Sequence, residues 1–164
     1  MTEHPRITLV LDCLRSAHNT GNIFRIAEAV GACEVLCCGY TPCPPHPKLA
    51  KTAMGTDRIV PFRWFKTSRE AAETLRREGF AQILAAEWNA SSVPAWRMTY
   101  RFPLALILGN EALGVHPDTL QIADGCVGLP MFGQKSSVNV GNAAAAILAA
   151  VIASQDCGKK DFSG

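Results

Sequence analysis

The chain has 164 residues, of which 48% are hydrophobic and 18% are charged, a composition that excludes an intrinsically disordered chain. Its length suits one domain with a substantial hydrophobic core. Sixteen lysine and arginine residues against 14 aspartate and glutamate residues give a net charge of +2, which is compatible with RNA binding but too small to indicate it.

The seven cysteines are an odd number, and several lie in apolar runs, where a free thiol packs as a small hydrophobic group. Because no secretory segment or long apolar span is visible, we expect a reducing, cytoplasmic location. The spacing Cys37-Cys38-x4-Cys43-x2-His46 resembles a zinc-binding run only in part, since paired Cys-x2-Cys spacing and a second ligand cluster are both missing. We therefore expect no metal site.

The first part of the chain predicts two strands and one helix. Residues 7–11 form an apolar, β-rich run that we interpret as a buried strand. Residues 19–22 interrupt this pattern as a turn, and residues 23–30 then show helical spacing, with Gly31 in the position where helices end. Residues 34–38 predict a second strand.

Prolines separate the next elements. A proline-rich loop over residues 42–47 precedes a short helix at 48–54. Residues 58–62 predict a third strand, whose proline favours a sheet edge or a strand terminus. Thr67 or Ser68 caps a helix that runs to residue 78.

The second half of the chain predicts three more strands, at residues 80–86, 104–108 and 126–129. The loop between the first two, residues 87–103, carries four aromatic residues, which either mark a partner surface or, as we prefer, pack half-buried. Residues 143–153 are apolar on every side, so this last helix is expected to be buried. Alternating strands and helices predict a single-domain α/β sandwich with a mainly parallel sheet.

Three polar, glycine-bearing loops follow predicted strands, at residues 19–25, 108–114 and 128–142. Ligands collect at the carboxyl ends of strands in an open α/β sheet, so these loops predict one small-molecule pocket. A triphosphate-binding loop is excluded because neither Lys-Ser nor Lys-Thr follows Gly114. A dinucleotide-binding fold is not supported either, because no Gly-x-Gly-x-x-Gly follows the first strand. Taken one at a time, the loops read as turns and helix caps.

Taken together, the loops resemble a known family. The segments are Asn19-x-Gly-Asn-Ile-x-Arg25-x-Ala27, Leu108-Gly-Asn-Glu-x-x-Gly114, Leu129-Pro-Met-x-Gly133 and Ser137-x-Asn-Val140. In order and spacing they resemble the motifs of the SPOUT methyltransferases, and most closely the TrmH/SpoU branch, which methylates ribose 2′-hydroxyls in RNA. The resemblance runs from about residue 7 to residue 153, nearly the whole chain.

The resemblance implies a single SPOUT domain over residues 1–164, with a core at about 6–155 and a short C-terminal tail. It also implies a C-terminal trefoil knot, a homodimer, and S-adenosylmethionine held by the knot loops. The implied cofactor contacts are Leu108, Gly109, Gly114, Leu129, Met131, Val138 and Asn139.

The implied catalytic residues are Arg25, Asn19, Glu111, Ser137 and Asn139. Arginine keeps its proton above about pH 12, so a free guanidine base is disfavoured. Our hypothesis is that Arg25 fixes a phosphate and stabilises negative charge on the 2′-oxygen. Asn19 would orient Arg25 or a phosphate, and Glu111 would hold that arginine or another basic residue across the dimer. Ser137 and Asn139 would shape the junction of cofactor and target ribose.

The expected activity is 2′-O-methylation of tRNA, with ribosomal RNA as the nearest alternative and a non-catalytic knotted RNA-binding dimer as the alternative from another class. A basic segment interleaved with aromatic residues could hold an RNA backbone or simply be a solvated edge; its charges are Lys48, Lys51, Arg58, Arg63, Lys66 and Arg69. One departure from the family pattern is Gly141-Asn142, where many relatives carry a hydroxyl residue and then an apolar one. We expect Gly141 to allow close backbone approach.

Overall fold

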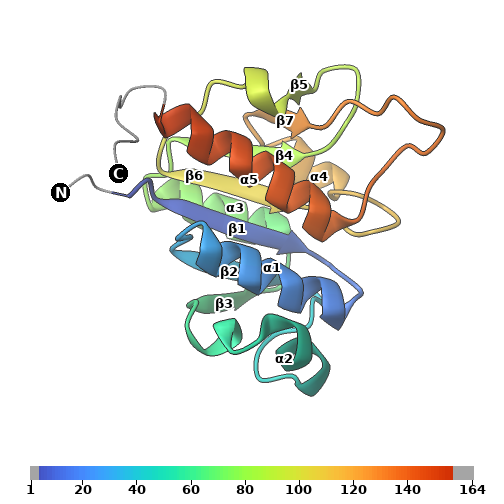
Figure 1. Ribbon diagram of the computed structural model, residues 1–164. Helices are drawn as coiled ribbons and strands as arrows, with labels where there is room; N and C mark the ends of the chain where they lie inside the picture. The colour runs from blue at the N-terminus through green and yellow to red at the C-terminus, as the bar shows by residue number, and fades with distance from the viewer. Residues whose placement is uncertain (1–3, 157–164) are drawn as a thin grey trace, which may run out of the picture.

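The computed structural model describes residues 4–156 of the chain. Seven strands form one sheet in the order β3-β2-β1-β6-β4-β7-β5, and every neighbouring pair is parallel (Figure 1). The predicted α/β sandwich with a parallel sheet is confirmed. The strands are β1 (Ile7–Asp12), β2 (Glu34–Cys38), β3 (Phe62–Phe65), β4 (Gln82–Ala86), β5 (Val93–Pro94), β6 (Leu104–Leu108) and β7 (Gly125–Gly128).

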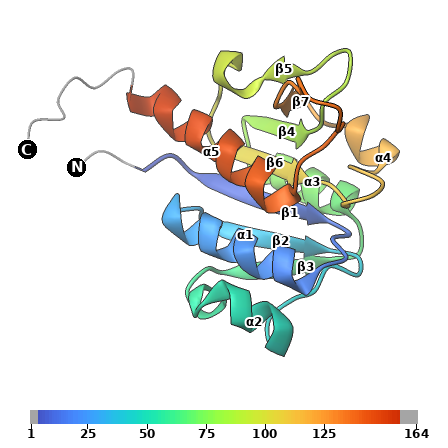
Figure 2. The same cartoon turned by 45° about the vertical axis from the view of Figure 1, so that its right-hand side comes forward.

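Helices cover both faces of the sheet. One face carries α1 (Ala17–Ala29) and α5 (Val140–Asp156), and the other carries α3 (Ser68–Arg77) with the short α4 (Pro117–Leu120) (Figures 1 and 2). Helix α2 (Pro47–Ala53) packs mainly against α1 beyond the sheet edge. Two 3-10 helices, η1 (Thr56–Arg58) and η2 (Ala95–Arg97), complete the described elements.

The core lies on both sides of the central strands β1 and β6. Within β1, Leu9 and Leu11 pack toward α1 and α5, whereas Val10 packs toward α3, as alternation along a strand requires. All five residues of β6 are buried, which explains why the sequence shows an uninterrupted apolar run there. This doubly covered centre makes the carboxyl ends of β1, β6 and β4 a rigid platform.

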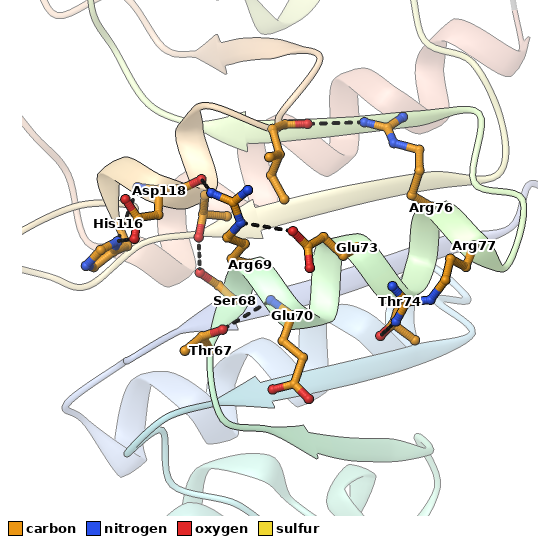
Figure 3. A network of polar contacts seen from close by, with 12 residues as sticks. Thr67, Ser68, Arg69, Glu70, Glu73, Thr74, Arg76, Arg77, His116 and Asp118 are labelled. Carbon is orange, nitrogen blue, oxygen red and sulfur yellow. Dashed lines mark hydrogen bonds and ion pairs between the residues drawn. The ribbon is translucent and has the colours of Figure 1, made fainter.

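Polar contacts tie α3 to the segment that leads into β7. Figure 3 shows Arg69 on α3 reaching both Glu73 and the backbone of Asp118. Arg76 makes two hydrogen bonds with the carboxylate of Asp124, at 2.9 and 3.0 Å, and that carboxylate also accepts from the backbone N–H of Ile83 at the start of β4. These contacts position the connection between α4 and β7.

The prediction of a turn at residues 19–22 was wrong, because these residues lie inside α1. The helix begins earlier than expected, since the Ser16 side chain accepts a hydrogen bond from the Asn19 backbone N–H at 3.1 Å and caps it. Gly21 is therefore a packing residue: a Cβ there would collide with Thr52 Oγ1 and Leu49 O of α2. The glycine allows α1 and α2 to lie in contact.

Two sheet edges also differ from the predictions. The third strand was expected at residues 58–62 but is Phe62–Phe65, because residues 56–58 form η1 and pairing with β2 starts where the Pro61 carbonyl accepts from Val35 N. The two-residue strand β5 lies in the segment predicted as a loop. In that segment Trp96 is 62% exposed and Trp88 is 41% exposed, whereas two other aromatic residues pack against the core, Tyr100 and Phe102.

Helix α5 is not buried on every side, contrary to the prediction. Ala144, Ile147, Leu148 and Val151 are buried against the sheet and α1. The opposite face is exposed and is lined by alanines, namely Ala145, Ala146, Ala149 and Ala153. An apolar pattern marks surface that avoids water, but it does not say whether the chain itself supplies the cover. The threading of α5 through an earlier loop stays a prediction of the family resemblance.

Candidate active site

A cavity of about 690 Å³ opens at the carboxyl ends of β6, β4 and β7, beside the start of α5. This is the edge of the sheet at which ligands of parallel α/β proteins bind. Both apolar and polar residues line the cavity. Its lining includes the predicted cofactor contacts Leu108, Gly109, Gly114, Leu129, Met131, Val138 and Asn139, and the predicted catalytic residues Asn19, Glu111 and Ser137.

Three of the predicted residues form a chain of hydrogen bonds. Asn19 Nδ2 donates to Glu111 Oε1 at 3.0 Å, and Asn139 Nδ2 donates to Asn19 Oδ1 at 3.0 Å. These side chains come from α1, the loop after β6 and the start of α5, far apart in the sequence. The fold therefore brings the three loops to one site, as expected.

Glu111 joins two loops through its carboxylate. Its oxygens accept hydrogen bonds from the backbone N–H groups of Arg15 at 3.0 Å and Ser16 at 3.2 Å, in addition to Asn19. Partial burial by itself raises the pKa of Glu111, but the hydrogen bonds from Arg15, Asn19 and Ser16 together hold that pKa below its ordinary value. Glu111 is thus a fixed negative charge at neutral pH. Within the described part of the chain it contacts the backbone of Arg15 and not an arginine side chain, and the pairing with a basic residue across the dimer stays a prediction.

This arrangement predicts how pH affects the role of Glu111 in stability. Because folding lowers its pKa, the contribution is present above the unfolded-state pKa and is lost as pH falls through the folded-state pKa. Glu111→Gln should unfold at lower urea concentration than the unmodified protein at neutral pH, and this gap should shrink below about pH 4.3. Urea unfolding followed by fluorescence between about pH 7 and 3 measures it. A gap that stays constant over that range would contradict the assignment.

The loop after β6 is held by Asn110, which sequence analysis did not single out. Asn110 is buried; its Nδ2 donates to Cys13 O at 2.8 Å and to Tyr40 Oη at 2.9 Å. Its Oδ1 accepts from the backbone N–H groups of Ala112 and Leu113, both at 2.9 Å. All hydrogen-bonding positions of the amide are occupied, so the loop has one conformation.

Asn139 caps α5 as well as facing the cavity. Its Oδ1 accepts from the backbone N–H groups of Gly141 at 2.9 Å and Asn142 at 3.3 Å. A Cβ on Gly141 would lie 2.6 Å from Asn22 Nδ2 and 3.1 Å from Asn139 Oδ1. The expectation that Gly141 permits close approach is confirmed, and the group that approaches is the Asn22 side chain.

We expect Gly141→Ala to destabilise the protein by up to about 2 kcal/mol, because overpacking costs about 1–3 kcal/mol and the gain in helix propensity offsets about 1 kcal/mol of it. Urea unfolding measures the change. In an Asn22→Ala background the clash is gone, so the same substitution should be neutral or stabilising. Equal destabilisation in both backgrounds would show that Asn22 is not the obstacle.

Arg25 is the one predicted site residue that the single chain does not bring to the cavity. It is exposed on α1 and is absent from the cavity lining. Arg25 follows Asn19 by six residues, which places it about 9 Å along the helix axis and about 120° around it. The expected convergence of Arg25 with Glu111 and Asn139 thus does not occur within one chain.

Glu87 and Trp88 also line the cavity, and sequence analysis missed both. They follow β4 directly, so the rule that selected the other loops, namely polar residues at the carboxyl end of a strand, would have found them. Among residues 4–156, no group of three or more histidine, cysteine or acidic side chains is placed to hold a metal ion.

The parallel sheet and the cavity at the carboxyl ends of its central strands define the class of the fold: an α/β protein with a ligand site at the carboxyl edge of its sheet. The family model described as the SpoU rRNA Methylase family matches residues 6–149. The chain therefore belongs to this family, and the resemblance seen in the motifs is confirmed.

Several relatives of the chain are named as 2′-O-methyltransferases of tRNA or rRNA. Over 144 residues the chain is 31% identical to a tRNA (guanosine(18)-2′-O)-methyltransferase of Thermus thermophilus, covering 88% of this chain and 73% of the relative. The protein of the same name from Escherichia coli is also 31% identical over 88% of this chain, which spans 62% of that protein. A 23S rRNA (guanosine-2′-O-)-methyltransferase RlmB of Ralstonia nicotianae is 30% identical over 84% of this chain and 55% of its own length.

Solved structures agree with the fold. The SpoU methyltransferase AviRb from Streptomyces viridochromogenes, in complex with the cofactor AdoMet, is 25% identical with a TM-score of 0.85, covering 96% of this chain and 63% of that one. An AdoMet-bound rRNA methyltransferase from Sinorhizobium meliloti is 25% identical with a TM-score of 0.84, covering 93% of this chain and 57% of that one.

Proposed function

We propose that this protein transfers a methyl group from S-adenosylmethionine to a ribose 2′-hydroxyl of RNA. The observation that carries the proposal is the convergence of Asn19, Glu111 and Asn139 on one cavity at the carboxyl edge of the sheet. Membership of the SpoU family and AdoMet-bound neighbours support it. A binding module without catalysis would not need this polar chain beside a cofactor cavity.

The residues that line the cavity fit S-adenosylmethionine. A Cβ on Gly109 would collide with the backbone of Gly114 and Val115, so these glycines form a tight cradle of backbone in the cavity wall. Leu129 and Met131 supply apolar surface for an adenine. The cavity lining, all of it within the described residues, includes two carboxylates and no lysine or arginine. A negatively charged cavity suits a ligand that carries a sulfonium and an ammonium against one carboxylate.

When bound, this cofactor supplies an electrophilic methyl group, and the protein's own groups must place the ribose hydroxyl in line with it. Placement alone can lower the barrier by several kcal/mol. Glu111 anchors the loops that hold Asn19, and Asn19 in turn orients Asn139 at the start of α5. The amide of Asn139 is therefore held rigidly at the cavity mouth, where a ribose would enter.

We further propose that the active form is a homodimer that brings Arg25 of one chain to the cavity of the other. The exposed alanine face of α5 is apolar surface without a cover among residues 4–156, and Arg25 lies exposed on the neighbouring helix α1. A two-fold dimer would cover the alanine face of α5 and would bring Arg25 to the cavity of the partner chain. The cavity has no cation of its own among its lining residues in the described chain, so a guanidinium from a partner would complete it.

For the substrate we propose tRNA, because relatives that the chain covers to 73% and 62% of their own length are named as tRNA methyltransferases. Ribosomal RNA is the second candidate, supported by the RlmB relatives. In the basic segment, Arg63 pairs with Glu34 and Glu78, and Arg69 pairs with Glu73, so these two charges are engaged. The remaining cations, for which no ion pair is found among residues 4–156, are Lys48, Lys51, Arg58 and Lys66. These are available for phosphates.

A cytoplasmic location is also proposed. All six cysteines within the described part of the chain are free thiols, as expected in a reducing compartment. Within the same part, no helix has the length and apolar character that a membrane crossing requires.

Two measurements test the function. Calorimetric titration should show binding of S-adenosylmethionine, and incubation with labelled cofactor should transfer label to tRNA transcripts in a form that protects the adjacent phosphodiester bond from alkali, since methylation blocks the 2′-oxygen. Label on ribosomal RNA fragments alone would select the second candidate. Absence of any cofactor binding would end the proposal of a methyltransferase.

A further inference from the structure

Glu87 is a carboxylate in the cavity with no role in the reaction described above. It follows β4, lies half-buried at the cavity wall, and is held on both sides through its backbone. Its N–H donates to Val127 O at 3.1 Å, and its carbonyl accepts from Ser92 Oγ at 2.8 Å. The backbone that carries the Glu87 side chain is therefore held in place.

The carboxylate itself is also fixed. Its Oε1 accepts a hydrogen bond from the backbone N–H of Val115, directly after the cradle glycine Gly114. A Cβ on Gly114 would collide with Oε1 and would lie 3.3 Å from Oε2, so both oxygens lie against this glycine. Glu87 thus links the end of β4 to the loop that follows β6.

One oxygen of this carboxylate is available to a ligand. Oε2 accepts no hydrogen bond from any group in the described part of the chain, and no lysine or arginine forms an ion pair with Glu87 there. Oε2 is open to solvent, since among residues 4–156 the buried side-chain atom without a partner is Thr8 Oγ1. A ligand that displaces water from Oε2 must bring hydroxyl or ammonium donors, because a carboxylate oxygen left without donors is costly.

The position of Glu87 in the cavity indicates which donor it faces, a ribose hydroxyl or the ammonium group. A Cβ on Gly128 would lie 2.7 Å from the Glu87 carbonyl oxygen, so Glu87 abuts the segment that leads into the apolar wall at Leu129. If an adenine lies on that wall, the group attached to it is the ribose, whereas the ammonium lies beyond the sulfonium. Acidic side chains that accept from ribose hydroxyls serve the same purpose in dinucleotide sites.

We propose that Glu87 is a specificity residue of the cofactor site, whose carboxylate accepts hydrogen bonds from the vicinal hydroxyls of the ribose of an adenosyl ligand. The proposal rests on the proposed function, since it assumes that the cavity holds an adenosyl group. Glu87 also couples ligand to protein, because its other oxygen holds the backbone of the loop after β6. The site thereby favours ribonucleosides over deoxyribonucleosides.

Calorimetry with three ligands tests this: S-adenosylhomocysteine, 5′-methylthioadenosine, which lacks the amino-acid part, and 5′-methylthio-2′-deoxyadenosine. Glu87→Gln keeps an acceptor for Val115, so it should fold normally, and it should bind the first two ligands about tenfold more weakly. Removing the 2′-hydroxyl should weaken binding to the unmodified protein, but weaken it much less in Glu87→Gln, because the two changes remove the same interaction. Glu73→Gln, on the exposed side of α3, is the matched control and should change nothing (Figure 3).

The outcomes separate the two proposals. If the unmodified protein binds none of the three ligands, the proposed function fails. If it binds them but Glu87→Gln binds them equally well, only the role of Glu87 fails. A loss confined to S-adenosylhomocysteine would assign the carboxylate to the ammonium instead and would overturn the inference. If the variant proves unstable, equal affinity of the unmodified protein for the ribo and deoxy ligands would still overturn the inference.

Discussion

Arg25→Ala should lower the rate of methyl transfer at least a hundredfold while leaving the affinity for S-adenosylmethionine within about twofold, because preorganised donors at a developing oxyanion contribute about 10²–10³ in rate. The side chain lies outside the cavity of its own chain, so its loss should not disturb the cofactor. Single-turnover rates and calorimetry measure the two quantities. Near-normal turnover by Arg25→Lys would show that the bidentate geometry of the guanidinium does not matter and would contradict this role.

Mixing two inactive variants tests where Arg25 acts. In a heterodimer of Arg25→Ala and Asn139→Ala, one of the two sites combines an intact Asn139 with the intact Arg25 of the other chain. Random assembly of equal amounts should therefore restore about a quarter of the unmodified activity. The two variants are best co-expressed with different tags, so that the heterodimer can be isolated. No recovery in the isolated heterodimer would show that Arg25 does not act across an interface.

Gly109→Ala should weaken binding of S-adenosylmethionine at least a hundredfold, which corresponds to about 2.7 kcal/mol. The added methyl group would collide with backbone atoms of Gly114 and Val115, and backbone cannot move aside as a flexible side chain can. The loop after β6 would have to shift, although Asn110 and the Asn110–Gly114 backbone pair hold it in place. Calorimetric titration measures the loss.

Gly133→Ala is the matched control for this prediction. Gly133 lies in the loop before α5, and a Cβ there would meet nothing within 4 Å. The same chemical change should leave binding within about twofold, since surface substitutions of this kind usually have small effects. An affinity of Gly109→Ala within threefold of the unmodified protein would show that the cradle is not as tight as the structure indicates.

The sequence by itself determined those features that depend on local pattern. The strand at Leu104–Leu108 was predicted at its observed bounds, because a strand covered on both faces requires an unbroken apolar run. Helix α3 was predicted because Thr67 caps it and Gly79 follows its end. A shared pocket was predicted because parallel strands bring their carboxyl ends, and the loops behind them, to one edge. The individual cavity residues came from the family resemblance of those loops.

The tertiary structure decided what depends on contacts between distant segments. The place of Arg25 follows from the early start of α1 at the Ser16 cap, which rotates Arg25 away from Asn19. Glu87 holds the loop after β6, because that loop closes against its carboxylate. Glycine is favoured at position 141 because the Asn22 side chain fills the space beside it. Hydrophobic periodicity in the sequence shows which side chains avoid water, but only the tertiary structure shows which elements cover them. For the alanine face of α5, no cover is found among residues 4–156, and the homodimer proposed above would supply one.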